Sequence, residues 1–307
     1  MPKDFVTLAD WPKQELLRIL DRARELKGLH RSGHRPQTLE GRVLAMFFEK
    51  PSLRTHVTFE AGVTQLGGHA LLLRPEQVGI GDRETPRDVA RNLSRWVDAI
   101  VARTFSHRLV EELAEEATIP VINGLTDLLH PCQVMADLQT IAERVELKDA
   151  LIAYVGDGNN MANSLLLGSA VMGLELRLGT PQDHRPAPRI WQRAEQLATR
   201  SGARLSWSED PREAVRGAAF VYTDAWTSMG QEGERARRRD IFERYQVNAA
   251  LLAEAPDALV MHCLPAHRGE EITAEVLDGE RSLALEQAEN RLHVQKAILE
   301  RLLLPGA

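Results

Sequence analysis

Short apolar runs alternate with amphipathic stretches along the whole chain. Apolar runs of this length predict buried strands, and stretches with a 3.6-residue period predict helices. In the first part of the chain, strands are expected at 42–49, 96–103 and 121–123, and helices at 53–66, 108–117 and 130–146. The alternation then restarts, with strands expected at 151–157, 174–180, 204–208, 220–225 and 259–264, and helices from Met161, near 188–200, at 211–218 and at 282–303.

Strands that alternate with helices favour an α/β fold with parallel sheets. The restart after residue 146 predicts two doubly wound parallel-sheet domains, joined by the 130–146 helix as a bridge, with the C-terminal helix packing back on the first domain. The expected boundaries are 1–135, 136–285 and 286–307, which agrees with a length of 307 residues. Ligands of open parallel sheets bind beyond the carboxyl ends of the strands, so residues that follow strands are the first candidates for function.

Composition and charge narrow the function class. The net charge is −6 and the sequence pI is about 6.0. The sequence has no stripe of basic residues, so nucleic-acid binding is not expected. Only two cysteines, Cys132 and Cys263, are present, which favours a reducing cytoplasm over a secreted disulfide framework. The N-terminus lacks the pattern of a signal peptide, and no apolar run approaches the roughly 20 residues of a membrane span. A cytoplasmic protein without membrane or nucleic-acid partners is expected.

The segment FFEKPSLRTHVTFE at 47–60 follows the first strand and opens a helix. Unpaired N–H groups at a helix N-terminus suit a phosphate. The hydroxyls of Ser52 and Thr55 and the guanidinium of Arg54 would add donors. The simpler interpretation is that Ser52 only caps the helix and Arg54 is solvated.

Two further segments follow strands and open helices. HPCQ at 130–133 offers an imidazole and an amide that could donate to a carbonyl oxygen, although a surface histidine beside a cap is the common case. GDGNNMANS at 156–164 resembles a nucleotide loop but lacks the G-x-G-x-x-G glycines. Its paired asparagines suit an amino-acid head group, which needs donors and acceptors together. Alternatively they form a turn.

Three segments near the end of the chain complete the candidates. TDAWTSMGQE at 223–232 has the composition of a mobile active-site loop or of a plain surface loop. MHCLPAHRGEEIT at 261–273 places Cys263 at the end of a strand, as a functional thiol or a buried small side chain, and a cis Pro265 is possible. Zinc at His262, Cys263 and His267 is disfavoured by their spacing. Arg291 could bind an anion or be an ordinary arginine on a helix surface.

Taken together and in this order, these segments resemble the aspartate/ornithine carbamoyltransferase family over nearly the whole chain. SLRT, HPCQ, DGNN, SMG and HCLPAHRG are close to the ornithine-specific branch. The last two carry most of the specificity, because the aspartate branch ends this strand differently and has no SMG loop. The resemblance therefore implies transfer of a carbamoyl group from carbamoyl phosphate to the δ-amine of L-ornithine.

The resemblance also implies the residues of a carbamoyl phosphate site. The phosphate would be bound by Ser52, the backbone N–H of Leu53, Arg54 and Thr55. Arg103 would contact phosphate and carbonyl, His130 and Gln133 would hold the carbamoyl group, and Cys263, the backbone of Leu264 and Arg291 would complete the pocket. A neighbouring subunit would add Gln77 from the loop 76–84, and the sequence of this loop departs from the family pattern. The assembly implied is a homotrimer or a larger assembly of trimers.

For ornithine, the resemblance implies binding by Asn160, Asp224, Ser228 and Met229, with Cys263 beside the δ-nitrogen. Catalysis would rest on Arg103, His130, Asp224 and Cys263. The implied chemistry uses neither a metal nor an organic cofactor, because the acyl phosphate of the substrate is already activated.

Other functions stay open on the residues alone. A related acceptor such as acetylornithine or putrescine is the nearest alternative, and the SMG segment argues against both. A catalytically silent paralogue is disfavoured because the candidate residues are all present, namely Ser52, Arg54, Thr55, His130, Asp224 and Cys263. A Rossmann-type dehydrogenase is disfavoured by the missing glycine fingerprint.

Overall fold

The computed structural model describes residues 2–227 and 232–304, and the chain divides into two compact units. Unit 1 comprises Met1–Gln139 with Glu289–Ala307, and unit 2 comprises Thr140–Ala288. The boundaries expected from the sequence, after residues 135 and 285, lie four and three residues before these divisions. Both divisions fall inside helices, because α6 (Pro131–Ala142) and α13 (Ala284–Leu303) each begin in one unit and end in the other.

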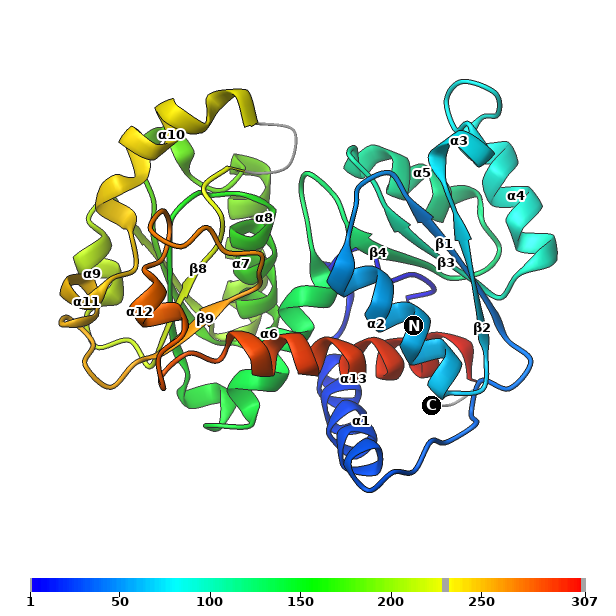
Figure 1. Cartoon of the computed structure of the whole chain (residues 1–307), viewed down its shortest axis with the longest axis horizontal. Helices are drawn as coiled ribbons and strands as arrows, with labels where there is room; N and C mark the ends of the chain where they lie inside the picture. The colour runs from blue at the N-terminus through cyan, green and yellow to red at the C-terminus, as the bar shows by residue number, and fades with distance from the viewer. Residues whose placement is uncertain (1, 228–231, 305–307) are drawn as a thin grey trace. The chain divides into compact units, whose positions relative to one another are not determined.

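Unit 1 contains a four-stranded, fully parallel sheet in the order β2-β1-β3-β4 (Figure 1). The strands are β1 (Val43–Phe48), β2 (His69–Leu73), β3 (Ala99–Arg103) and β4 (Val121–Leu125). The chain leaves β1 for the edge strand β2 and then returns to the other side of β1, so the winding reverses between β1 and β3. Such a reversal point is where ligands of open α/β sheets bind.

Unit 2 contains a five-stranded, fully parallel sheet in the order β7-β6-β5-β8-β9. The strands are β5 (Leu151–Val155), β6 (Glu175–Gly179), β7 (Arg204–Ser208), β8 (Phe220–Thr223) and β9 (Leu259–His262). Here the winding reverses between β5 and β8. The two doubly wound sheets confirm the predicted fold class.

Helices connect the strands in both units (Figure 1). In unit 1 they are η1 (Leu8–Asp10), α1 (Lys13–Arg31), α2 (Leu53–Gln65), α3 (Pro75–Val78), α4 (Pro86–Trp96) and α5 (His107–Glu116). In unit 2 they are η2 (Leu147–Asp149), α7 (Asn160–Met172), η3 (Gln182–His184), α8 (Pro188–Ser201), α9 (Pro211–Val215), η4 (Glu232–Glu234), α10 (Arg235–Phe242), η5 (Glu243–Tyr245), α11 (Ala249–Leu252) and α12 (Ala274–Leu277). Within the described ranges, no helix is both long and apolar enough to cross a membrane.

Apart from Arg103 at the end of β3, the strands β1, β3 and β5 are apolar because the sheets are covered on both faces. Every residue of β3 is buried, as are four of the five residues of β5. Helix α7 is buried from Met161 to Met172 and is mostly apolar, as expected for a helix enclosed by the core, with Asn163, Ser164 and Ser169 as its buried polar residues. Continuous apolar runs therefore mark the interior elements in this chain.

The strand predicted at 96–103 is too long at its start. Trp96 is the last residue of helix α4 and is 70% exposed, and β3 begins only at Ala99. Asp98 interrupts the run because its carboxylate accepts a hydrogen bond from the N–H of Val43 (2.8 Å) and pairs with Arg42. The predicted 130–146 helix is likewise shorter, ending at Ala142.

A buried lysine lies between helices α13 and α2 of unit 1. Lys296 is 1% exposed and its ammonium donates to the side-chain oxygen of Gln65. Burial, assisted by the charge of Arg35, lowers the pKa of Lys296 from its usual 10.5 to about 8, against the opposing effect of Glu300. The folded chain thus favours the neutral amine at alkaline pH.

Replacing this lysine is expected to change how stability depends on pH. Between pH about 8 and 10.5 the unfolded chain still holds the lysine proton and the folded chain has released it, so the free energy of unfolding rises with pH. The full effect of the shift is about 3 kcal/mol. Lys296→Met should remove this rise. As the pH falls from 10 to 8, the free energy of unfolding should therefore decrease in the parent but not in the variant. Denaturant unfolding across this range measures the difference, with the exposed Lys148→Met as control. Parallel curves for the parent and Lys296→Met would contradict the assignment.

Candidate active site

Ser52 and Thr55 form the N-terminal end of helix α2, which follows β1. The Ser52 hydroxyl accepts a hydrogen bond from the backbone N–H of Thr55 (3.1 Å), so Ser52 does cap the helix. Leu53 is the first residue of the helix and its side chain is 73% exposed. Its N–H belongs to the first helical turn, where helix geometry supplies no backbone acceptor. The cap therefore leaves room for an anion to accept from this end of the helix.

Two buried arginines converge on the hydroxyl of Thr55. Arg103, the last residue of β3, donates to this oxygen at 3.3 Å, and Arg291 of α13 donates to it at 2.8 Å. The arginines are 6% and 2% exposed, so Arg291 is not the surface residue that its local sequence suggested. Buried guanidinium groups beside a helix N-terminus create strong positive potential, as a phosphate site requires.

Gln133 holds one of these arginines. Its side-chain oxygen accepts from Arg291 (2.6 Å), and its amide nitrogen donates to the buried carboxylate of Asp137 one turn further along α6 (2.8 Å). The amide thus links a buried cation to a buried anion, which offsets part of the cost of burying both. Asp137 was not singled out from the sequence, and its position four residues after Gln133 on one helix face was the available signal.

His130 precedes helix α6 and is 5% exposed, so it is not the surface histidine of the simpler interpretation. Its pKa is held well below the usual 6.5, first by burial and then by the charges of Arg291, Arg103 and Arg54. The imidazole is therefore neutral at physiological pH. A neutral imidazole can donate one hydrogen bond to a carbonyl oxygen without repelling the neighbouring guanidiniums.

Gln77 lies apart from this group within the chain. It is exposed on the short helix α3, and its side-chain oxygen accepts from the backbone N–H of Arg74 at the start of that helix (3.0 Å). Arg54 occupies the first turn of α2 and is partly exposed. Unit 1 thus brings together Arg103, His130, Gln133, Arg291 and the start of α2.

In unit 2, the loop after β5 and the loop after β8 meet at the reversal point of the sheet. Asn159 caps helix α7, because its side-chain oxygen accepts from the N–H groups of Met161 (2.9 Å) and Ala162 (3.3 Å). Its amide nitrogen donates to the carboxylate of Asp224 at 2.8 Å. The sequence pointed instead to Asn160, which is the first residue of α7 and accepts from the Ser164 hydroxyl through its backbone oxygen (2.7 Å).

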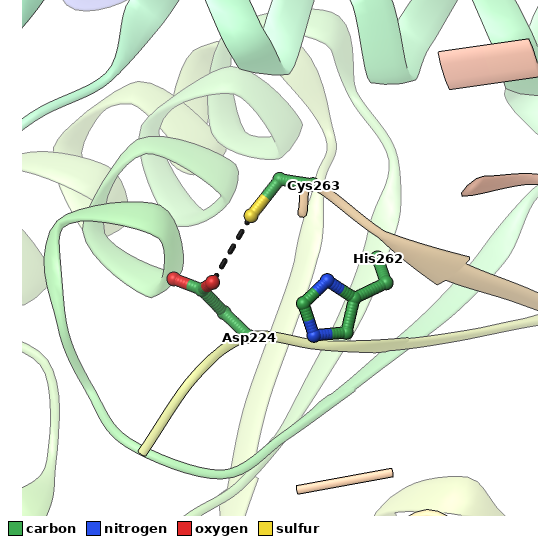
Figure 2. Close-up of side chains that lie close together, drawn as sticks. All are labelled: Asp224, His262 and Cys263. Atoms are coloured by element: carbon green, nitrogen blue, oxygen red, sulfur yellow. Dashed lines mark hydrogen bonds between the residues drawn. The ribbon is translucent and has the colours of Figure 1, made fainter. Parts of the chain in front are cut away.

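Asp224 and Cys263 form a hydrogen-bonded pair at the ends of the adjacent strands β8 and β9 (Figure 2). The thiol donates to one carboxylate oxygen at 3.0 Å, and the N–H of Ala225 donates to the same oxygen at 2.8 Å. Cys263 is partly exposed and is not simply a small side chain in the core. A carboxylate beside a thiol at a sheet reversal point can bind and orient a substrate ammonium group.

Ser228 and Met229, the other predicted ornithine residues, lie outside the described residues. Leu264 follows Cys263 in unit 2, and its peptide bond to Pro265 is cis. The buried guanidinium of Arg238 in α10 anchors the loops around this site, since it pairs with Asp157 after β5 and donates to the carbonyl of Trp226 after β8. None of this anchoring was expected from the sequence.

The loop after β5 requires glycine for a different reason than a nucleotide loop does. A Cβ atom at Gly158 would lie 2.4 Å from the carbonyl oxygen of His184 and from the backbone of Arg185. The N–H of Gly158 donates to that same carbonyl at 2.8 Å. Gly158 thus lets two loops of the backbone pack directly against each other.

Among residues 2–227 and 232–304, two groups of side chains have the proximity that a metal ion would need. One is Asp224 with His262 and Cys263, and the other is His267 with Glu270 and Glu271. In the first group both ring nitrogens of His262 already face hydrogen-bonding partners, Leu264 and Glu271. A metal there would have to displace one of them, so the geometry favours a hydrogen-bonded cluster.

The fold and the two groups of residues define a two-domain α/β protein with buried cationic side chains at a helix start in one unit and an acidic, thiol-containing group in the other. Residues 3–143 match the model for the carbamoyl-P binding domain of aspartate/ornithine carbamoyltransferases, and residues 148–302 match the model for the Asp/Orn binding domain. The chain belongs to the aspartate/ornithine carbamoyltransferase family.

Individual relatives agree with this assignment. An ornithine carbamoyltransferase from Anoxybacillus flavithermus is 52% identical over 303 residues, which cover 98% of this chain and 96% of that protein. The structure of ornithine carbamoyltransferase from Pyrococcus furiosus is similar, with a TM-score of 0.95, 46% identity and coverage of 98% of this chain and 96% of that one. The Thermus thermophilus enzyme gives a TM-score of 0.87 and 44% identity, with 99% of both chains covered.

Proposed function

We propose that this chain is an ornithine carbamoyltransferase, which transfers the carbamoyl group of carbamoyl phosphate to the δ-amine of L-ornithine to give L-citrulline and phosphate. The observation that carries the proposal is the convergence of Arg103 and Arg291 on Thr55 at the start of α2. Family membership supports the choice of reaction, and the names of the relatives support ornithine as acceptor.

In this proposal, unit 1 binds carbamoyl phosphate. The phosphate accepts from the α2 terminus and its side chains, and the arginines neutralise its charge. The neutral imidazole of His130 and the amide of Gln133 hold the carbamoyl group, and Gln133 also keeps Arg291 in place. The residues proposed for the whole site are Ser52, Leu53, Arg54, Thr55, Gln77, Arg103, His130, Gln133, Cys263, Leu264 and Arg291.

Ornithine is proposed to bind in unit 2, through Asn160, Asp224, Ser228 and Met229, with Cys263 beside the δ-nitrogen. The amine of ornithine is protonated at neutral pH, since a lysine-like amine has a pKa of about 10.4. Asp224 attracts and orients this ammonium, and its own orientation is fixed by Asn159, Ala225 and the thiol of Cys263.

The chemical step requires the amine in its neutral form. After loss of a proton, the δ-nitrogen forms a bond to the carbamoyl carbon, and negative charge builds on the carbonyl oxygen. Thr55, Arg103 and His130 stabilise this charge, and each good donor contributes about 3–4 kcal/mol in comparable oxyanion sites. The bond from carbon to the phosphate oxygen then breaks, the departing phosphate takes the extra proton of the new C–N nitrogen, and phosphate leaves among groups that already neutralise its charge. The reaction needs no cofactor because the acyl phosphate supplies the driving force.

A homotrimer, or an assembly of trimers, is part of the proposal, because Gln77 would complete the site of a neighbouring subunit. Exposed apolar side chains on α2 and β2 support a subunit contact on unit 1, and these are Leu53, Val57, Leu71 and Leu72. A closed ring satisfies a head-to-tail interface of this kind. The cytoplasm is the proposed compartment, which suits the free thiols of Cys132 and Cys263.

The test is citrulline formation from carbamoyl phosphate with ornithine, compared with acetylornithine, putrescine and aspartate as acceptors. Turnover with ornithine alone is expected. Asp224 is proposed to pair with the δ-ammonium of ornithine, which aspartate lacks. The other proposed ornithine residues need a free α-amino acid end, which acetylornithine and putrescine lack. Light scattering of the same preparation should give the mass of three chains or a multiple of it. Preference for another acceptor would contradict the ornithine residues, and no turnover with any acceptor would contradict the enzyme assignment.

A further inference from the structure

His262 is the last residue of β9. Both nitrogens of its ring and its backbone N–H have hydrogen-bonding partners. Its side chain is fully buried, and its backbone N–H donates to the side-chain oxygen of Gln287 (2.8 Å). Its Nδ1 accepts from the N–H of Leu264 (2.9 Å), and its Nε2 lies 3.2 Å from the carboxylate of Glu271. Because Nδ1 is an acceptor, the ring proton must be on Nε2, from which it donates to Glu271.

Glu271 holds the ring from the other side. Its carboxylate is fully buried, and the oxygen that faces His262 also accepts from the N–H of His267 (2.5 Å). Its own backbone oxygen accepts from the N–H of Val247 (2.8 Å). The carboxylate is therefore fixed by the turn that follows Pro265, and it selects one tautomer and one orientation of the His262 ring.

The consequence appears in the peptide between Cys263 and Leu264. Its N–H is bonded to His262, so the plane of this peptide is set by the ring. Leu264 also has a φ of 57°, a left-handed conformation that L residues rarely adopt and that must be held by its surroundings. The same peptide follows directly on the Cys263 whose thiol reaches Asp224 (Figure 2).

We propose that His262 and Glu271 are positioning residues, which orient the Cys263–Leu264 peptide and so place the thiol of Cys263 against Asp224 for the acceptor amine. This inference rests on the proposed function, in which Asp224 and Cys263 meet ornithine. His262 acts through the backbone and contacts no substrate. The ring lies next to Asp224 and Cys263 in Figure 2, but its nitrogens are directed to Leu264 and Glu271.

Three substitutions of His262 separate its two hydrogen bonds. In His262→Asn the side-chain oxygen can replace Nδ1 as acceptor for the Leu264 N–H, whereas in His262→Gln the longer amide can replace Nε2 as donor to Glu271. His262→Phe keeps the ring shape and loses both bonds. If orientation of the peptide is what matters, His262→Asn should lose least, and the other two should lose about tenfold or more in kcat/KM for ornithine.

Glu271 provides a second, independent series. Both donors reach the same carboxylate oxygen, so Glu271→Gln can keep both hydrogen bonds and Glu271→Leu can keep neither. Val260→Ala, in the same strand and buried in the unit 2 core, is the matched control for lost stability. It should lower the unfolding temperature without raising the KM for ornithine.

A readout that does not depend on the reaction is the rate at which iodoacetamide alkylates Cys263. Peptide mapping distinguishes Cys263 from Cys132, and Cys132 is fully buried, so it should react little. A thiol that donates to Asp224 keeps its proton and reacts slowly, because the thiolate is the nucleophile. Alkylation should therefore be slow in the parent, His262→Asn and Glu271→Gln, and faster in His262→Phe and Glu271→Leu.

The outcomes separate this inference from the proposed function. Faster alkylation together with a raised KM for ornithine in His262→Phe, and smaller changes in His262→Asn, would support the positioning role. Faster alkylation in a protein whose parent makes no citrulline would still support it and would refute the proposed function instead. Parent-like alkylation and ornithine KM in His262→Phe, or equal losses in the Asn and Phe variants, would overturn it.

Discussion

Arg103→Ala is expected to reduce kcat/KM for carbamoyl phosphate by about 10²–10³-fold. Arg103 ends β3 with its guanidinium buried and directed to Thr55. In the proposed mechanism its loss removes a charged donor from both the phosphate and the developing oxyanion. Arg103→Lys should lose less, because the charge is kept while the planar fork is lost. Steady-state kinetics with carbamoyl phosphate as the varied substrate measures both.

The matched control for Arg103 is Arg95→Ala, which removes an exposed arginine from α4 in the same unit. It should leave the kinetics unchanged. The KM for ornithine should change less than that for carbamoyl phosphate, because the residues proposed to bind ornithine lie in unit 2. Direct titration of Arg103→Ala with carbamoyl phosphate should show weakened binding. Binding as tight as in the parent would contradict the phosphate site proposed here.

Asp224→Asn is expected to lower kcat/KM for ornithine by about 10²–10³-fold, with carbamoyl phosphate binding unchanged. The substitution removes the negative charge that is proposed to attract the ornithine ammonium. Loss of one charged hydrogen bond costs about 1.5–3 kcal/mol of binding, and misplacement of the amine should lower kcat as well. The new amide would also meet the donors of Asn159 or Cys263. Kinetics with ornithine as the varied substrate, and titration with carbamoyl phosphate, test the two parts.

A charge exchange sharpens this test. Asn159→Asp combined with Asp224→Asn restores one donor and one acceptor between the two positions but moves the carboxylate to the α7 cap, where aspartate also caps well. The double variant should regain stability and remain poor with ornithine, because the charge no longer lies beside Cys263. Recovery of ornithine turnover would show that the hydrogen bond, rather than the position of the charge, is what Asp224 provides.

The sequence predicted the elements whose signal is local. Continuous apolar runs marked the buried strands, and the doubly wound fold followed from their alternation with helices. Strand β2 was missed because HALLL is a short apolar run, which periodicity alone does not distinguish from a helical segment. Helix α4 was not predicted, and the strand predicted at 96–103 included its last residue, Trp96, because no glycine or proline separates the helix from the strand.

The candidate site was predicted where residues follow strands and missed where distant segments meet. Arg291 looks like a surface residue in its own helix, and only the fold brings it to Gln133, 158 positions earlier in the chain. The resemblance pointed to Asn160 in the DGNN loop, and the role of its neighbour Asn159, which caps α7 and donates to Asp224, was not predicted. The bond between His262 and Glu271 depends on how the turn after Pro265 closes, which spacing does not reveal.

The discontinuity of unit 1 has a consequence for synthesis on the ribosome. Chains are made from the N-terminus, and domains tend to fold as units when their residues emerge. Unit 2 is continuous from Thr140 to Ala288, whereas unit 1 needs Glu289–Ala307 as well as its first 139 residues. The unit whose translation begins first is thus the last to be completed. Until then the nascent chain lacks Arg291, and Thr55 and Gln133 lack a donor that they have in the finished protein.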